Sequence, residues 1–198
     1  MSLLNLKPTS IVMILGNRRT GKSHLGKWLI KNYPRYVVFD SLLEHDDLGF
    51  VVHDHLSLYR TVKDRIVYQG EDFHNVARYI LTRSNIAFMV DEIELRATKH
   101  KIDPSLDRII RHGGHANISL IGITRSTNEV HNNCLRFANY LCLFKMHFEN
   151  DLKFLRNWVG EEAIAQLPYL KEHYWICYDL ETHTWAIYSP IPLRHRRL

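Results

Sequence analysis

The sequence predicts an α/β fold with a mostly parallel central sheet, and three observations support this prediction. Short apolar runs rich in β-branched residues recur along the chain, for example at residues 10–16 and 117–126. Segments with helical spacing of apolar residues, such as 71–84, alternate with these runs. The runs show little apolar–polar alternation, which is typical of strands buried on both faces. We therefore expect helices on both sides of one sheet.

The expected elements can be placed in chain order. Strands are predicted at 10–16, 36–40, 64–70, 85–92, 117–126 and 138–146, with two closing strands at 174–180 and 184–190. Helices are predicted at 21–33, 71–84, 105–112 and around 151–158. Pro34 should end the first helix. Pro104 should begin the third, and Gly113-Gly114 should stop it.

Composition indicates one globular domain without a membrane anchor. The 198 residues are 45% hydrophobic and 24% charged. No apolar run approaches the roughly 18 residues that span a bilayer, and the N-terminus lacks a secretory pattern, so we expect a cytoplasmic protein. Cys134, Cys142 and Cys177 have no paired spacing, which favours reduced thiols. Histidines at 53–55 and 112–115 lack a matching set of ligands, so no structural metal is expected.

The first predicted strand runs directly into a basic loop bracketed by glycines. Its residues are Gly16, Asn17, Arg18, Arg19, Thr20, Gly21, Lys22 and Ser23. They match G-x-x-x-x-G-K-[ST], the phosphate-binding P-loop, between a strand and a helix as that motif requires. We expect this loop and His24 to bind the phosphates of ATP. Lys22 should reach the β- and γ-phosphates, and the Ser23 hydroxyl should ligate Mg²⁺.

Two further predicted strands end in polar residues. Asp91 and Glu92 follow the apolar run at 85–90, at the sheet edge where ligands bind in α/β proteins. Asp91 should hold Mg²⁺, and Glu92 should orient and deprotonate the attacking water. Thr124 and Arg125 end the strand at 117–126 and could touch the γ-phosphate or that water.

Together these motifs resemble the additional-strand, catalytic-glutamate class of P-loop ATPases (RecA/ASCE-like). Within that class they resemble the FtsK/HerA superfamily, particularly its small viral genome-packaging members. The resemblance covers residues 10–160 and follows the order P-loop, intervening strand, "MVDEIE", arginine-bearing helix, "ISLIGITRS". It implies a three-layer fold and one ATPase domain over 1–198. The domain would have a core at about 10–160 and C-terminal strands with a basic tail at 170–198.

The resemblance also implies an arginine supplied in trans by a neighbouring subunit. Arg111 best matches that position, and Arg108 is the alternative. Such an arginine would neutralise charge in the transition state. The family usually has glutamine where this chain has Arg125, so a sensor-like role for Arg125 departs from the family pattern.

The function implied is an ATP-hydrolysing motor that translocates double-stranded DNA into a viral capsid. A trans arginine implies a ring, a pentamer or hexamer, because each site is incomplete in a monomer. A net charge of +5 and a pI near 9.1 fit an acidic partner. DNA phosphates could contact Arg96, Lys99 and Lys101, or the tail at 194–198. Proteins of the capsid vertex or of the virion membrane would be its docking partners. The protein would act in the host cytoplasm or be associated with the virion.

Two alternatives remain open from the sequence. A nucleotide or small-molecule kinase could use the same P-loop, although the Asp91-Glu92 pair and the intervening strand favour hydrolysis. An ATP-binding scaffold for virion assembly or export would resemble filamentous-phage assembly proteins. Intact catalytic candidates disfavour that second alternative.

Overall fold

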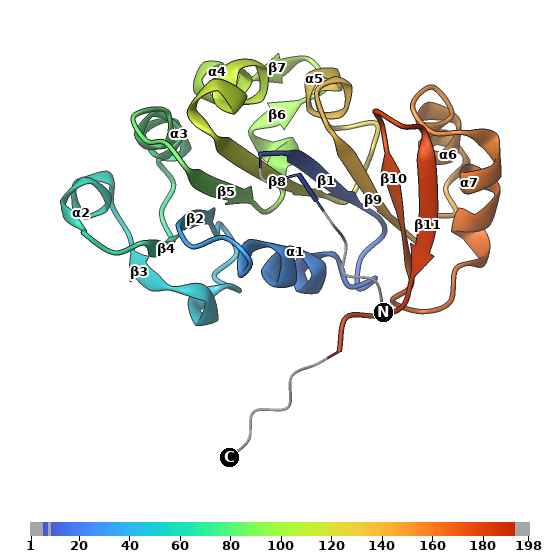
Figure 1. The fold of residues 1–198 in the computed structure, drawn as a ribbon, viewed down its shortest axis with the longest axis horizontal. Coiled ribbons are helices and arrows are strands. Elements are labelled where there is room, and N and C mark those ends of the chain that lie inside the picture. The colour runs from blue at the N-terminus through green and yellow to red at the C-terminus, as the bar shows by residue number, and fades with distance from the viewer. Residues whose placement is uncertain (1–5, 8, 193–198) are drawn as a thin grey trace.

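A nine-stranded sheet forms the centre of the molecule (Figure 1). The computed structural model describes residues 6–7 and 9–192, so the predicted basic tail at 194–198 lies outside the described residues. In spatial order the strands are β11 (Thr184–Tyr188), β10 (Trp175–Asp179), β9 (Tyr140–Phe144), β1 (Ile11–Leu15), β8 (Ile118–Thr124), β5 (Ile86–Val90), β2 (Tyr36–Phe39), β4 (Arg65–Tyr68) and β3 (Phe50–Val52). The seven strands from β9 to β3 pair in parallel, and β10 and β11 are antiparallel. The predicted mostly parallel sheet is confirmed.

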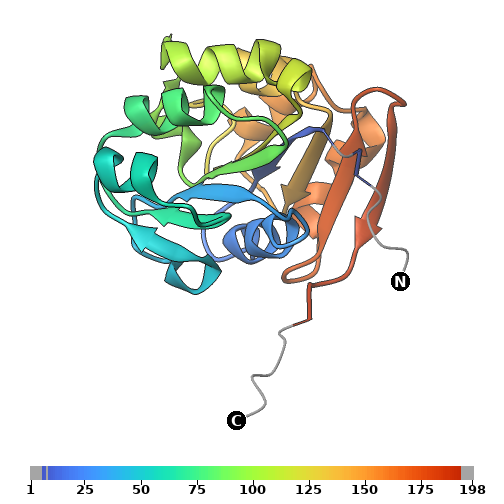
Figure 2. The same cartoon turned by 60° about the vertical axis from the view of Figure 1, so that its left-hand side comes forward.

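Helices cover both faces of this sheet, so the fold has three layers (Figure 2). Along β1, Val12 and Ile14 belong to one apolar cluster, and Met13 and Leu15 belong to the other. Helix α1 (Lys22–Ile30) packs into the first cluster. The second takes α2 (His55–Arg60), α3 (Phe73–Leu81), α4 (Pro104–His112), α5 (Asn132–Arg136), α6 (Glu149–Leu155) and α7 (Glu161–Gln166).

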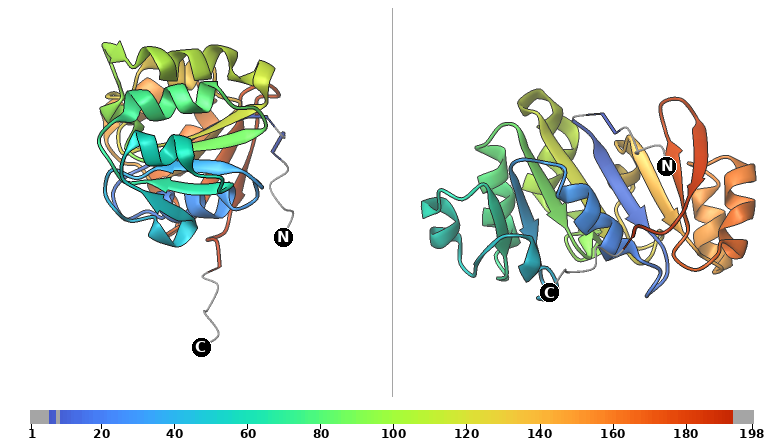
Figure 3. Two further views of the ribbon diagram at one scale, coloured as in Figure 1. Left: turned by 90° about the vertical axis from the view of Figure 1, so that its left-hand side faces the viewer. Right: turned by 60° about the horizontal axis from the view of Figure 1, so that its bottom comes forward.

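Parallel pairing brings the carboxyl ends of the central strands to one edge. Strand β8 lies between β1 and β5, and Leu15 is in register with Thr124. Strand β5 also pairs with β2, where Val90 is opposite Phe39. The segments that follow β1, β5, β8 and β2 therefore emerge side by side (Figure 3). The fold itself assembles a site from four distant parts of the sequence.

Several short elements were not expected from the sequence. They are β3, α2, α5, α7 and a two-stranded hairpin of β6 (Ala97–Thr98) and β7 (Lys101–Ile102). None exceeds six residues, which is too short for apolar periodicity to be read. Helix α4 ends at His112 with Gly113 as its C-cap, as predicted, but Gly113 does not take the left-handed conformation. Gly113 has a φ of −58°, the chain continues as a 3₁₀ helix to Ala116, and Asn117 adopts the left-handed conformation with φ 54°.

No helix in the described part of the chain is both long and apolar enough to cross a membrane.

Candidate active site

The P-loop between β1 and α1 has positive φ angles at three positions, a backbone conformation that favours glycine. Gly16 has φ 157°, Gly21 has φ 106°, and Arg19 has φ 62°. A Cβ added at Gly16 would lie 2.6 Å from the Cβ of Phe144, at the end of β9. Gly16 is therefore required by both backbone conformation and close packing.

Lys22 is buried and turned back onto its own loop. Its side chain is 7% exposed, and Nζ donates to the carbonyl oxygen of Asn17 at 2.7 Å. Burial lowers the pKa of Lys22 to about 8, with Asp91 opposing and Arg125 assisting the shift. The Lys22 ammonium therefore has one neutral acceptor in this structure. A hydrogen bond to an anionic acceptor would be stronger.

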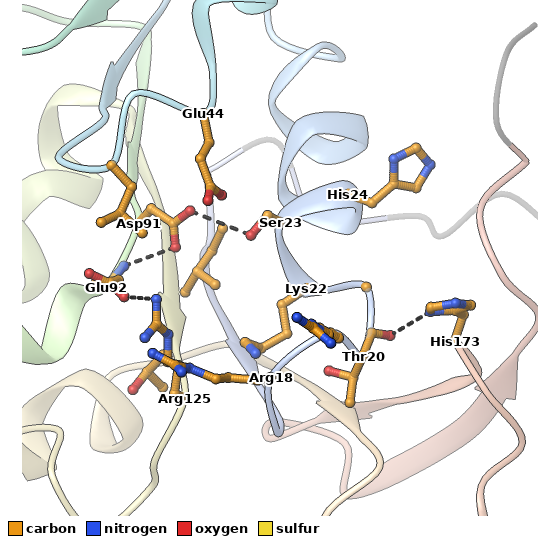
Figure 4. Close-up of a pocket in the computed structure, with 15 residues that line it drawn as sticks. Arg18, Thr20, Lys22, Ser23, His24, Glu44, Asp91, Glu92, Arg125 and His173 are labelled. Carbon is orange, nitrogen blue, oxygen red and sulfur yellow. Dashed lines mark hydrogen bonds and ion pairs between the residues drawn. The ribbon is translucent and has the colours of Figure 1, made fainter.

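Ser23, in the first turn of α1, and Asp91, directly after β5, bring a hydroxyl oxygen and a carboxylate oxygen together (Figure 4). The Ser23 hydroxyl donates to Oδ2 of Asp91 at 3.5 Å, and the backbone N–H of Glu92 donates to Oδ1 at 2.9 Å. One hydroxyl and one carboxylate are what Mg²⁺ uses when it also binds substrate phosphates. In the described part of the chain, no group of three or more His, Cys, Asp or Glu residues is arranged to hold a metal. Such a cage is not needed for this mode of binding.

Glu92 forms an ion pair with Arg125, across the ends of β5 and β8 (Figure 4). Glu92 itself has φ 52° and begins a short 3₁₀ turn. The backbone N–H of Arg125 donates to Glu94 at 3.3 Å, and burial raises the pKa of Glu94. The segment after Arg125 is held by the buried carboxylate of Asp151, which accepts from the Thr127 hydroxyl at 2.6 Å.

These side chains surround one cavity of about 540 Å³. Residues 18–24, Asp91, Glu92, Thr124 and Arg125 all line it. Gly16 is buried beside these residues without lining the cavity, and the side-chain amide of Asn17 lies 3.0 Å from Nδ1 of His147. Every predicted P-loop and strand-end residue is thus in or beside a single cavity.

Three polar residues at this site were not predicted. Glu44 reaches the cavity from the segment after β2 (Figure 4), and His173 contacts the Thr20 carbonyl oxygen at 3.2 Å. His45, next to Glu44, is wholly buried and lies 2.8 Å from Asp91. The signal for Glu44 and His45 was present, because both follow a buried strand in "YVVFDSLLEH" as Asp91 does in its own segment.

A smaller, mostly apolar cavity of about 310 Å³ adjoins the P-loop. Gly21, His24 and His173 border both cavities, and Phe144, Trp175, Pro190 and Ile191 complete the smaller one. Among the described residues, the buried atoms Nε2 of His24 and Nε1 of Trp175 have no hydrogen-bond partner. Unpaired buried polar atoms beside an apolar hollow fit a flat ligand with polar edges.

The two candidate trans arginines lie on α4 and line neither cavity. Arg111 pairs with Asp107 at 2.8 Å, and its guanidinium lies 5.2 Å from the ring centre of Phe137. Arg108 is exposed and, within the described chain, forms no ion pair. Arg96, expected to be free for DNA, instead lies over the rings of Phe39 and Phe73.

The fold and the position of the P-loop define the class. A three-layer α/β fold with a large, mostly parallel sheet is the fold of P-loop NTPases, and β8 is inserted between the P-loop strand and the acid-bearing strand. The expected fold class is confirmed.

Solved structures with this fold include a viral protein of nearly the same length. The genome packaging NTPase B204 from Sulfolobus turreted icosahedral virus 2, in complex with ATP-gammaS, has a TM-score of 0.84 at 21% identity. The alignment covers 94% of this chain and 100% of that chain. B204 from Sulfolobus Turreted Icosahedral Virus, a DNA-packaging ATPase, gives 0.78 at 22% identity with the same coverage.

A more distant structure is VirB4 of Thermoanaerobacter pseudethanolicus. Its TM-score is 0.63 at 12% identity, covering 93% of this chain and 90% of that one. No protein-family model and no curated protein sequence matches this chain. The structural neighbours thus include packaging and VirB4-type ATPases, and their fold is consistent with the FtsK/HerA resemblance of the sequence.

Proposed function

We propose that this protein hydrolyses ATP in the 540 Å³ cavity. The observation that supports this most is the convergence of Lys22, Ser23, Asp91 and Glu92 at the carboxyl ends of β1 and β5. Lys22 would move from the Asn17 carbonyl to the β- and γ-phosphates. Ser23 and Asp91 would hold Mg²⁺, which when bound neutralises charge on the phosphates.

Glu92 is proposed as the general base. Its carboxylate lies at the end of β5, where a water in line with the γ-phosphate could be deprotonated. The ion pair with Arg125 holds that carboxylate before nucleotide arrives. Arg125 is the nearest cation that could transfer from Glu92 to the γ-phosphate, which would replace the glutamine of the related family.

The smaller cavity is proposed to receive the nucleobase. It is continuous with the P-loop through Gly21, and Trp175 and Phe144 are stacked with ring centres 6.3 Å apart. A base edge would satisfy the unpaired Nε1 of Trp175 and Nε2 of His24. The B204 structures bound to ATP-gammaS and AMPPCP support nucleotide binding by this fold.

At the level of the assembly, we propose a ring that moves double-stranded DNA, with viral genome packaging as its task. Neither α4 arginine lines the cavity of its own subunit, so an α4 arginine would have to act on the site of a neighbouring subunit. Arg108, exposed and unpaired in the described chain, is as well suited as Arg111. The description of B204 as a genome-packaging NTPase supports the choice of task.

ATP hydrolysis measured against protein concentration, with and without double-stranded DNA, tests this function. The rate per subunit should rise with concentration and with DNA. Glu92→Gln should lower it by about 100-fold or more while nucleotide binding persists. A rate that is flat, ignores DNA and survives loss of both α4 arginines would contradict the ring motor. Phosphate transfer to an added acceptor would instead indicate a kinase.

DNA binding is proposed to involve the hairpin between β6 and β7. Lys99 and Lys101 are exposed there, whereas Arg96 is engaged with aromatic rings. Contacts of this kind read phosphates, so binding should be independent of sequence and weaken steeply with salt. Lys99→Ala and Lys101→Ala should each reduce the slope of log affinity against log salt by about 1. An unchanged slope would exclude the hairpin, and Lys171→Ala, on another exposed loop, is the control.

A further inference from the structure

His45 makes a contact that the P-loop chemistry described above does not use. Its Nε2 lies 2.8 Å from Oδ2 of Asp91, and the ring is wholly buried. A carboxylate can only accept, so the imidazole proton lies on Nε2. Nδ1 is buried and has no partner in the described part of the chain, so the ring has this one polar contact.

That contact completes the orientation of the Asp91 carboxylate. Oδ1 accepts from the Glu92 N–H at 2.9 Å, and Oδ2 accepts from His45. With one oxygen held on each side, the carboxylate plane cannot rotate freely. The other lone pair of Oδ2 then points toward the Ser23 hydroxyl oxygen, which lies 3.5 Å from Oδ2.

The position of His45 is fixed in turn by Asp40, at the end of β2. The Asp40 carboxylate is wholly buried and accepts from the backbone N–H groups of Glu44 and His45, at 3.0 and 2.9 Å. Gln69, which follows β4, donates a third bond at 2.9 Å. A chain of hydrogen bonds from Gln69 through Asp40 to His45 thus joins the ends of β4, β2 and β5.

We propose that His45 is a positioning residue for Mg²⁺, which orients Asp91 through its Nε2–H. It does not touch the nucleotide cavity itself. Groups that hydrogen-bond a ligating carboxylate set its orientation and change metal affinity. This inference rests on the proposed Mg²⁺-dependent binding of ATP.

The test uses binding of AMPPCP to the full chain, measured by calorimetry in EDTA and at stepped Mg²⁺ concentrations. His45→Leu fills the space without a donor, and it should raise the half-saturating Mg²⁺ by about 10-fold or more. Affinity in EDTA should stay within about 2-fold of the parent, because no phosphate contact is lost. A purely structural residue would weaken binding in both conditions alike.

His45→Gln and His45→Asn form a matched pair. The glutamine amide nitrogen reaches the place of Nε2, so its Mg²⁺ response should lie within about 3-fold of the parent. The asparagine nitrogen stops at the place of Nδ1, so His45→Asn should behave like His45→Leu. If His45→Leu does not fold, the difference in Mg²⁺ response between His45→Gln and His45→Asn tests the proposal instead. His55→Ala is the control and should match the parent, because His55 is a half-buried histidine that lies 3.2 Å from Asp72.

Equal Mg²⁺ responses in the parent, Gln, Asn and Leu proteins would overturn the proposal, as would equal losses in all three variants. Failure of the underlying function is distinct. In that case the parent protein itself would bind AMPPCP equally well with and without Mg²⁺.

Discussion

The ammonium group of Lys22 is held by the same loop that it is proposed to leave. In the described part of the chain it donates to the Asn17 carbonyl oxygen, a neutral acceptor, and burial lowers the pKa of Lys22. Phosphate oxygens would offer full negative charge at the same place. The desolvation already imposed on the free protein therefore strengthens the attraction once a nucleotide enters.

This environment predicts a pH dependence of nucleotide affinity. Lys22 is protonated below its pKa of about 8 and neutral above it, and bound phosphate raises that pKa. Affinity should be flat from pH 6.5 to 7.5 and then fall by up to about tenfold per pH unit above pH 8. Calorimetric Kd values across pH 6.5–10 measure this. Lys22→Ala should bind weakly without that fall, and Lys27→Arg should keep the parent profile. A parallel fall in Lys22→Ala would contradict the assignment.

At the scale of elements, the P-loop depends on how closely β1 approaches β9. Gly16 leaves β1 with φ 157° and no room for a Cβ beside Phe144. The turn into α1 is therefore set by packing against a strand more than a hundred residues later.

Gly16→Ala should lower stability by about 1–3 kcal/mol and weaken nucleotide binding, because both the φ angle and the contact with Phe144 become strained. Gly114 is the matched control. A Cβ there meets nothing within 4 Å, so Gly114→Ala should change stability by less than about 1 kcal/mol. Urea unfolding measures both variants, and equal losses in the two would contradict this explanation.

The loop after β8 depends on α6 through one carboxylate. Asp151 accepts from the side chains of Ser126, Thr127 and Asn128 and from the backbone N–H of Thr127. This contact fixes the segment that follows Arg125.

Asp151→Ala should lower the free energy of unfolding by about 2–4 kcal/mol, because it leaves the buried donors of Thr127 without an acceptor. Asp151→Asn keeps an acceptor oxygen and should cost less. Glu149→Ala, an exposed change on the same helix, should be nearly neutral. Denaturant midpoints of the three variants test this order, and an equal midpoint for Asp151→Ala and Glu149→Ala would refute it.

At the scale of the whole molecule, the cavity that we propose binds nucleotide lies at the strand ends, and the α4 arginines do not line it. Within the described residues, the arginines that line the cavity are Arg18, Arg19 and Arg125, so the proposed transition-state arginine is either one of these or an arginine of another subunit. An arginine from the same subunit and an arginine from a neighbouring subunit predict different rates of ATP hydrolysis in rings that are mixed from two inactive variants.

Mixing Glu92→Gln with an Arg108→Ala/Arg111→Ala double variant distinguishes them. Each should be inactive alone. In mixed rings an intact Glu92 site can face an intact arginine from its neighbour at about a quarter of interfaces, so hydrolysis should recover to a similar fraction. Steady-state ATPase rates of one-to-one mixtures measure this. No recovery would place the arginine in the same subunit as the site or remove it from the mechanism.

The sequence by itself determined the local pieces of this protein. Buried strands, amphipathic helices, the P-loop and the Asp91-Glu92 pair depend on short-range periodicity and spacing, and each lies at or close to its predicted position. The shared cavity was also foreseeable, because carboxyl ends of parallel strands meet at one edge.

Only the tertiary structure decided what depends on strand order and register. It places His45 on Asp91, lays the guanidinium of Arg96 over the ring of Phe39, and sets Cys177 opposite Cys142 on neighbouring strands. These contacts join segments far apart in the chain, and no local pattern encodes which buried strand will lie beside which.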